Sequence, residues 1–265
     1  MTPQQLLSHY DSAELWSAAP GLEPSFDVAA AYQSALAVRE LRVRRGELPR
    51  GYKIGFTNRN IWPRYNVSAP VWGAMWSSTL QFCDGQGTVD LSGTCQPRIE
   101  PEAVFGLRTA PPAAATLAQL FDCLDWVAPG FEIVQSHLPG WKFTAADAVA
   151  DGGLHARLLV GRKVPVRDIA ASAEAFDQHL ATATVSLMQD GKPIDQGQGA
   201  NVLEGPLHAL HYFIHELRNC PNAPDLQAGD VITTGTWTDA WPVSAGQTWS
   251  AQFSAPLSRL DVQFV

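Results

Sequence analysis

Hydrophobic and polar positions follow two different periods along this chain. Over residues 27–46, alanine, valine and leucine recur every three or four positions, which predicts a helix. The same spacing predicts helices over residues 3–17 and 207–217. Thr116 follows the Pro- and Ala-rich stretch 110–115 and is placed to cap a further helix.

Alternating or continuously apolar segments predict strands through the rest of the chain. They are 52–56, 98–107, 131–136, 154–161, 182–189, 193–197, 231–235 and 258–265. Gly191-Lys192 is expected to form the hairpin turn between two of these strands. Because helices come first and strands later, the order favours an α+β fold with a mixed sheet. We expect one domain over 1–265, with a small helical part at 1–50 and a strand-rich core at 51–265.

Composition restricts the class of protein and its partners. The chain is 46% hydrophobic and 17% charged, which is enough apolar material for a large core. A net charge of −8 without basic runs argues against nucleic acid and anionic membrane as partners. The N-terminus lacks the basic and apolar regions of a secretion signal, and the four cysteines show no C-x-x-C spacing. We therefore expect a cytoplasmic protein.

Three glutamates in strand-like surroundings carry the first chemical signal. Glu100 and Glu102 are two positions apart, so on a strand they project from the same face, and a second strand can bring Glu132 beside them. Like charges crowded there would repel one another unless a cation held them, and oxygen ligands favour Mg²⁺ or Mn²⁺. The alternative is a solvated strand face, which is the commoner meaning of an isolated Glu-x-Glu.

Several short motifs occur together in a characteristic order. They are Gly51-Tyr52-Lys53-Ile54-Gly55-Phe56-Thr57, Pro97-Arg98-Ile99-Glu100-Pro101-Glu102, Phe131-Glu132-Ile133-Val134, Asp147-Ala148-Val149-Ala150-Asp151 and Leu226-Gln227-Ala228-Gly229-Asp230-Val231-Ile232-Thr233-Thr234-Gly235. In this order and spacing the chain, from about residue 27 onward, resembles the 2-keto-4-pentenoate hydratase and 4-oxalocrotonate decarboxylase group of the fumarylacetoacetate hydrolase superfamily.

The resemblance implies a mixed β-roll of the fumarylacetoacetate hydrolase C-terminal-domain type. It also implies a Mg²⁺ or Mn²⁺ site, a small 2-hydroxy-dienoate substrate or its 2-keto tautomer, and assembly into a homo-oligomer. By motif, Glu100, Glu102 and Glu132 match the metal ligands of the group, and Lys53 matches its active-site lysine. Lys53 is thus our candidate proton donor and acceptor, with burial expected to lower its pKa; the alternative is an ordinary lysine that reaches solvent.

One segment departs from the pattern of the group. Asp151 is a candidate for orienting a water or ligand, or else for capping a turn. Hydratases of the group usually continue with Asn and small hydroxyl residues, whereas this chain has Gly152-Gly153-Leu154-His155. His155 is accordingly considered as a replacement proton shuttle, with a structural role as the alternative.

The segment 61–78 contains Trp62, Trp72 and Trp76 and follows the Lys53 strand. We expect either a lid over the substrate pocket, with Trp72 in contact with substrate, or a loop held by buried aromatic residues. Arg59 and Arg64 are candidates for pairing with a second substrate carboxylate, although surface arginines are commoner.

These features favour a metal-dependent lyase that hydrates a 2-hydroxy-2,4-dienoate to a 4-hydroxy-2-keto acid in aromatic meta-cleavage catabolism. Three alternatives stay open at this point: a 4-oxalocrotonate-type decarboxylase, an acylpyruvate C–C hydrolase, and a non-catalytic homologue that binds another enzyme of the pathway.

Overall fold

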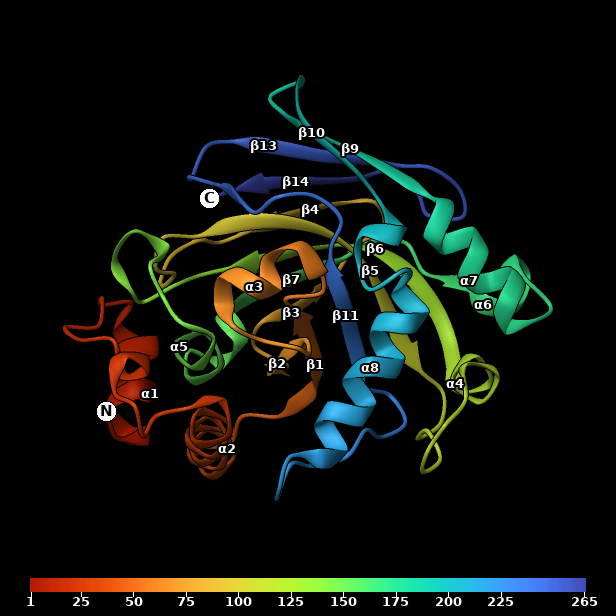
Figure 1. Ribbon diagram of the computed structural model, residues 1–265. Helices are drawn as coiled ribbons and strands as arrows, with labels where there is room; N and C mark the ends of the chain where they lie inside the picture. Colours follow the sequence, from red (N-terminus) through yellow and green to blue (C-terminus); the bar gives the residue numbers. More distant parts are fainter.

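The chain forms two β-sheets with helices packed around them (Figure 1). The computed structural model describes residues 1–265. The helices are α1 (Pro3–Ser12), α2 (Val28–Arg44), α3 (Trp62–Tyr65), α4 (Leu117–Cys123), α5 (Ala145–Ala150), α6 (Val166–Ile169), α7 (Ala173–Thr182) and α8 (Pro206–Asn219). No helix is both long and apolar enough to cross a bilayer.

The larger sheet runs in the order β2-β1-β11-β5-β6-β7-β3, with β12 beside β5 and β8 beside β6; the smaller sheet runs β10-β9-β13-β14-β4. The strands are β1 (Pro49–Gly55), β2 (Val71–Trp76), β3 (Leu80–Phe82), β4 (Gln86–Val89), β5 (Arg98–Leu107), β6 (Leu124–Val134), β7 (His155–Val160), β8 (Val164–Pro165), β9 (Thr184–Gln189), β10 (Lys192–Gln198), β11 (Val231–Thr236), β12 (Trp241–Pro242), β13 (Thr248–Phe253) and β14 (Leu260–Phe264). Both sheets mix parallel and antiparallel pairs, as expected for an α+β fold.

Strand register places the candidate chemistry at the centre of the larger sheet. β5 and β6 pair antiparallel, and Glu100 lies opposite Glu132 in that ladder. β1, which carries Lys53, is separated from β5 only by β11. Because directly opposed residues share one face of a sheet, the Glu100 and Glu132 side chains project to the same side.

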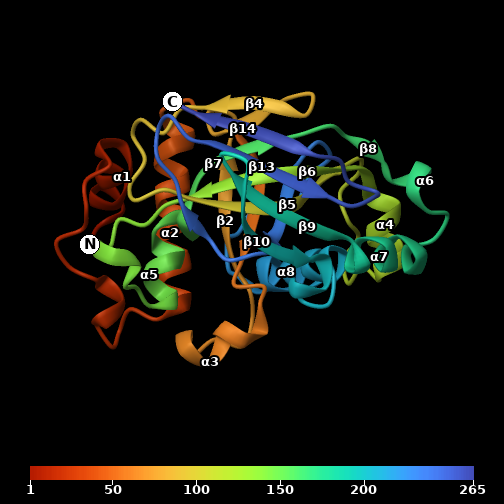
Figure 2. The same cartoon turned by 90° about the horizontal axis from the view of Figure 1, so that it is seen from above.

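Helices α1, α2 and α5 lie together beside the larger sheet (Figures 1 and 2). The Asp27 side chain caps α2 by accepting from the Ala30 N–H, as the sequence predicts for a helix beginning there. The helix expected over 3–17 is shorter, because Ala13 adopts a left-handed φ of 55° and ends α1. The chain then turns inward, and Trp16 is buried.

The segment 61–78 is not a single lid. Its second half forms strand β2, which pairs antiparallel with β1, while its first half contains the short helix α3. β2 is buried along nearly its whole length because α5, α8 and the turn Gly152–Leu154 pack against it in addition to β1. A buried strand without alternation is difficult to distinguish from an apolar loop by periodicity, which explains the error.

Candidate metal and substrate site

The three glutamates singled out in the sequence converge. Glu100, Glu102 and Glu132 each offer a carboxylate oxygen, and these oxygens all lie within 4.8 Å of one another. Strand alternation puts Glu100 and Glu102 on one face of β5, and the β5–β6 register adds Glu132. Glu102 and Glu132 are both 0% exposed, so the group is not a solvated strand face.

One oxygen of each buried glutamate accepts a hydrogen bond from the protein. The other oxygen is left free of hydrogen bonds near the point where the three carboxylates converge. Glu102 Oε2 accepts from the Gly235 N–H at 2.6 Å, while Glu102 Oε1 is buried without a hydrogen-bond partner. Glu132 Oε1 accepts from His155 at 2.8 Å, and its Oε2 lies 3.2 Å from Lys53 Nζ. A buried carboxylate oxygen without a donor is costly unless a cation binds it.

The charges of the site are poorly compensated by the protein alone. Burial raises the pKa of Glu100 to about 7 and raises that of Glu102 well above its usual range, with neighbouring carboxylates adding to the shift. Burial would also raise the pKa of Glu132, but Lys53 and His155 together hold it below its ordinary value. Three converging carboxylates, two of which have a buried oxygen without a hydrogen-bond partner, therefore fit a hard divalent cation such as Mg²⁺ or Mn²⁺.

Lys53 is buried beside this group, with 3% of its surface exposed. Glycine backbone surrounds its side chain: a Cβ at Gly55 would lie 3.3 Å from Lys53 Nζ, and one at Gly153 would lie 3.0 Å from Lys53 Cδ. Burial would lower the pKa of Lys53, but the three glutamates outweigh it and the pKa is raised. Burial thus acts in the direction expected from the sequence, which left the net direction open, and the closeness of the three carboxylates decides it.

A cavity of about 410 Å³ opens above Lys53 and Glu100. Glu102 and Glu132 are fully buried and do not line it. Aromatic side chains form one of its walls, and polar residues from 195–201 and 236–239 form another. Arg64 lines this cavity, which keeps it as a substrate-binding candidate.

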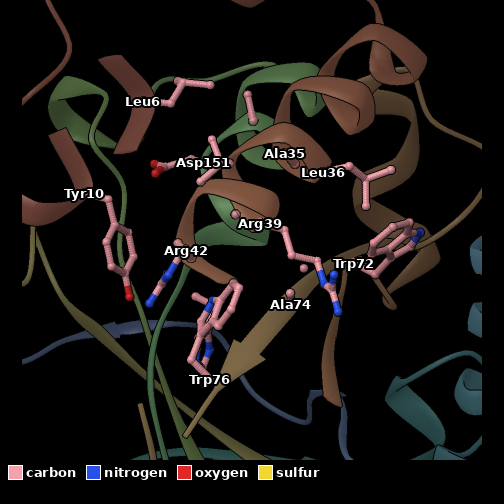
Figure 3. A pocket seen from close by; sticks show the side chains of 15 residues that line it. Leu6, Tyr10, Ala35, Leu36, Arg39, Arg42, Trp72, Ala74, Trp76 and Asp151 are labelled. Carbon is pink, nitrogen blue, oxygen red and sulfur yellow. The ribbon is translucent and has the colours of Figure 1, made fainter. Parts of the chain in front are cut away.

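Asp151 and Trp72 belong to a different, smaller cavity of about 60 Å³ between α1, α2 and β2 (Figure 3). The Asp151 carboxylate accepts from the His137 backbone N–H at 2.9 Å and contacts His137 Nδ1 at 2.6 Å. Trp72 stacks on Tyr32, with ring centroids 4.4 Å apart. Neither residue contacts the larger cavity, so the expected roles of Asp151 and Trp72 toward substrate find no support in their positions.

Arg59 also points away from the site. Its guanidinium pairs with Glu204 at 2.6 Å and donates to the Tyr212 hydroxyl at 2.7 Å, at an exposed position. Arg59 does not line the larger cavity. This position is that of a surface arginine, the alternative considered for Arg59, and it gives no support to a contact with a substrate carboxylate.

His155 lies behind the carboxylates, not above them. Its Nδ1 contacts Glu132, its Nε2 lies 2.9 Å from the Thr79 hydroxyl, and it lines the smaller cavity only. Burial lowers the pKa of His155, which favours the neutral ring. Because an ionised Glu132 can only accept, a neutral His155 donates from Nδ1 to Glu132, which leaves its Nε2 to accept a hydrogen bond from the Thr79 hydroxyl. This position suits the orientation of Glu132 and does not suit proton exchange with a substrate.

Arg98 is a charged residue of the site that the sequence reasoning did not select. It lines the larger cavity, donates to the Ala240 carbonyl at 3.3 Å and stacks over the Trp141 ring at 4.3 Å. Strand alternation was the available signal, because Arg98 precedes Glu100 by two positions and shares its face of β5.

Comparison with known proteins agrees with this geometry. The chain is 29% identical over 263 residues to 2-hydroxyhexa-2,4-dienoate hydratase of Comamonas testosteroni, covering 98% of this chain and 95% of that protein. It is 30% identical over 230 residues to 2-keto-4-pentenoate hydratase of Burkholderia vietnamiensis, covering 86% and 83%. No protein-family model matches the sequence.

The fold is shared with 4-oxalocrotonate decarboxylase of Pseudomonas putida G7, solved with magnesium and adipate. The TM-score is 0.87 at 23% identity, over 100% of this chain and 99% of that chain. This comparison shows that the two chains share one fold. By sequence similarity, the chain belongs to the 2-keto-4-pentenoate hydratase and 4-oxalocrotonate decarboxylase group of enzymes, which confirms the resemblance found in the sequence.

Proposed function

We propose that this protein is a Mg²⁺- or Mn²⁺-dependent hydratase that converts a 2-hydroxy-2,4-dienoate to a 4-hydroxy-2-keto acid in aromatic meta-cleavage catabolism. The observation that carries the proposal is the convergence of Glu100, Glu102 and Glu132 beside Lys53, at the base of a cavity. The names of the similar proteins, which include two dienoate or pentenoate hydratases, support the same reaction.

The three glutamates would hold the cation. When bound, the cation acts as a Lewis acid toward the carboxylate and 2-oxygen of the substrate. Lys53 is the proton carrier: its ammonium group, kept charged by the glutamates, is placed to protonate the distal carbon of the dienol. After that transfer the neutral Lys53 amine can take a proton from the water that adds at C4 of the conjugated ketone and can pass it to C3. The 2-hydroxyl proton of the dienol is released to solvent, and a proton from solvent recharges the amine. Full burial of Glu102 and Glu132 excludes solvent below the reacting atoms.

Loss of CO₂ from a 4-oxalocrotonate-type acid is the second candidate. It is favoured by the cavity floor near Lys53, where Gly153 and Leu154 present no side-chain hydrogen-bonding group for an attacking water. Acylpyruvate hydrolysis has less support, because it needs a base that activates water, and the candidate proton shuttle His155 does not line this cavity. A non-catalytic binding partner has least support, because a purely structural protein has no use for the buried, uncompensated carboxylates.

We further propose that residues 1–265 act as one domain with a β-roll core, and that the enzyme works in the cytoplasm as a homo-oligomer. The single run of strands from β1 to β14 through two neighbouring sheets supports the first statement. Light scattering on the purified protein tests the assembly.

The decisive experiment incubates purified protein with 2-hydroxypentadienoate and, separately, a 4-oxalocrotonate, each with Mg²⁺, Mn²⁺ or EDTA. Loss of dienol absorbance with a product heavier by one water supports the hydratase, and release of CO₂ from the second substrate supports the decarboxylase. EDTA should abolish either reaction. No turnover of either acid in the presence of metal would reject both.

A further inference from the structure

Four half-buried aromatic side chains line one wall of the larger cavity. Phe56 and Tyr65 come from the segment after β1, and Trp141 and Phe143 come from the segment before α5. Their rings form a continuous series, with centroids 4.7 Å apart for Phe56–Tyr65, 5.6 Å for Tyr65–Phe143 and 6.0 Å for Trp141–Phe143. We call these four residues the aromatic wall. Each shows surface to the cavity instead of being buried in the core.

The backbone holds the aromatic wall in an unusual conformation. Phe56 and Trp141 have left-handed φ angles of 57° and 60°, which bulky residues rarely adopt. Hydrogen bonds secure both positions: Trp62 Nε1 donates to the Phe56 carbonyl at 2.6 Å, and Trp141 Nε1 donates to the Gln96 carbonyl at 3.0 Å. Left-handed bulky residues tend to occur at functional sites, where the surrounding structure maintains them.

The cavity is larger and more apolar on this side than the reacting group needs. Its volume of about 410 Å³ falls in the range, roughly 300–1,000 Å³, of pockets that hold drug-sized ligands. A five-carbon dienoate bound at Lys53 and Glu100 would leave the aromatic wall exposed to water. Planar apolar groups pack well in offset or edge-to-face contact with such rings.

From these observations, and resting on the proposed function, we infer that the aromatic wall binds a planar, apolar tail on the far end of the substrate. The preferred substrates are then 2-hydroxy-2,4-dienoates with an aryl group on the terminal carbon, which we expect to bind more tightly than the unsubstituted dienoate or a dienoate that ends in a second carboxylate. The polar end of the substrate lies at the glutamates, and the tail extends along Phe56, Tyr65 and Phe143.

A binding experiment tests this inference independently of turnover. Metal-loaded protein is titrated in a calorimeter with two saturated 2-keto acids, one ending in a methyl group and one in a phenyl group. The phenyl acid should bind at least about tenfold more tightly, as expected for a filled apolar pocket. Equal affinity, or tighter binding of a keto acid that ends in a carboxylate, would overturn the inference.

Substitutions test whether the aromatic wall causes the preference for the phenyl acid. Phe143→Ala should remove most of the preference for the phenyl acid and leave the affinity of the methyl acid within about twofold, whereas Phe143→Leu should retain part of it. Phe82→Ala is the matched control, because Phe82 is an exposed phenylalanine on β3 that does not line this cavity. A preference unchanged in Phe143→Ala would also reject the aromatic wall as the tail site.

If the dienoates are not turned over but the phenyl acid binds as expected, the proposed reaction fails and the tail site stands.

Discussion

At the scale of single residues, the site is a balance of buried charges. Glu102 and Glu132 are completely buried, and one Lys53 ammonium group faces three carboxylates. Removing the Lys53 charge should lower kcat without weakening cation binding. Removing a glutamate charge should weaken cation binding. Mutations at these positions therefore separate ligands from proton carriers.

Lys53→Met should lower kcat by roughly 10²- to 10⁴-fold, the usual contribution of a general acid or base. The same variant should bind Mn²⁺ at least as tightly as the parent, because it no longer places an ammonium group 3.2 Å from Glu132. Steady-state kinetics and Mn²⁺ titration by electron paramagnetic resonance measure the two effects. Lys142→Met, at an exposed lysine, is the control. A near-normal kcat would remove Lys53 from the mechanism.

His155→Leu should weaken Mn²⁺ binding by roughly 10- to 100-fold, the usual cost of losing a group that orients a metal ligand. The physical reason is that Glu132 Oε1 loses its donor and the carboxylate is free to rotate. Thr79→Val removes the hydroxyl that fixes the His155 tautomer and should weaken binding in the same direction by a smaller factor. Unchanged Mn²⁺ affinity in a folded His155→Leu protein would mean that Glu132 is held by other contacts.

At the scale of elements, close backbone packing positions Lys53. β2 and the turn Gly152–Leu154 meet so tightly that a Cβ at Gly73 would lie 2.0 Å from the Gly152 carbonyl oxygen. Gly73 is also the cross-strand partner of Lys53 in the β1–β2 ladder. The departure from the group's usual sequence at Gly152-Gly153 thus coincides with a place where two backbones touch.

Gly73→Ala should destabilise the protein by about 1–3 kcal/mol, the typical cost of overpacking, and should lower kcat because Lys53 shifts. Gly152→Ala is a useful comparison: it has open space for a Cβ, so only its left-handed φ of 65° opposes the change. Chemical denaturation and kinetics measure both. Similar losses of stability and kcat in the two variants would show that β2 and the turn can move apart at little cost in free energy.

Glu47 connects the end of α2 to the start of β1 by pairing with the buried Arg42 and with Arg45. Burial opposes ionisation of Glu47, but both arginines outweigh it and its pKa is lowered. A lowered folded-state pKa contributes stability above the unfolded value of about 4.5, and this stability is lost as the pH falls through the folded pKa. The Tm difference between wild type and Glu47→Gln should therefore be constant above about pH 5 and shrink at lower pH. Asp84→Asn, at an exposed ion pair, should show little difference at any pH.

At the scale of the whole molecule, cation binding and folding are coupled, because the glutamates come from two strands and gather only in the folded state. At about 100 times its dissociation constant, a cation should add roughly 2.7 kcal/mol, which corresponds to a rise in Tm of about 5–10 °C. Glu102→Gln should abolish most of this rise while retaining a cooperative transition. Differential scanning calorimetry with Mn²⁺ and with EDTA measures it. A full Tm rise in Glu102→Gln would refute Glu102 as a ligand.

Much of the fold was predictable because it depends on local patterns. The helix capped by Asp27, the strand 98–107 and the helix over 207–217 lie where the sequence predicts them, within one or two residues. Strand alternation also placed Glu100 and Glu102 on one face. The strand β2 was missed because a uniformly buried strand lacks a distinct period. The helix α7 was missed although its buried residues Ala173, Phe176 and Leu180 follow helical spacing.

The sequence by itself determined which side chains share a strand face and, through the order of its motifs, the family to which the chain belongs. Only the tertiary structure decided that Glu132 reaches Glu100, that His155 supports Glu132 from behind, and that Asp151 faces another cavity. The physical reason is that alternation is a property of neighbouring residues, whereas these contacts depend on the register of strands that are far apart in the chain. The raised pKa of Lys53 has the same origin, since it depends on carboxylates carried by other strands.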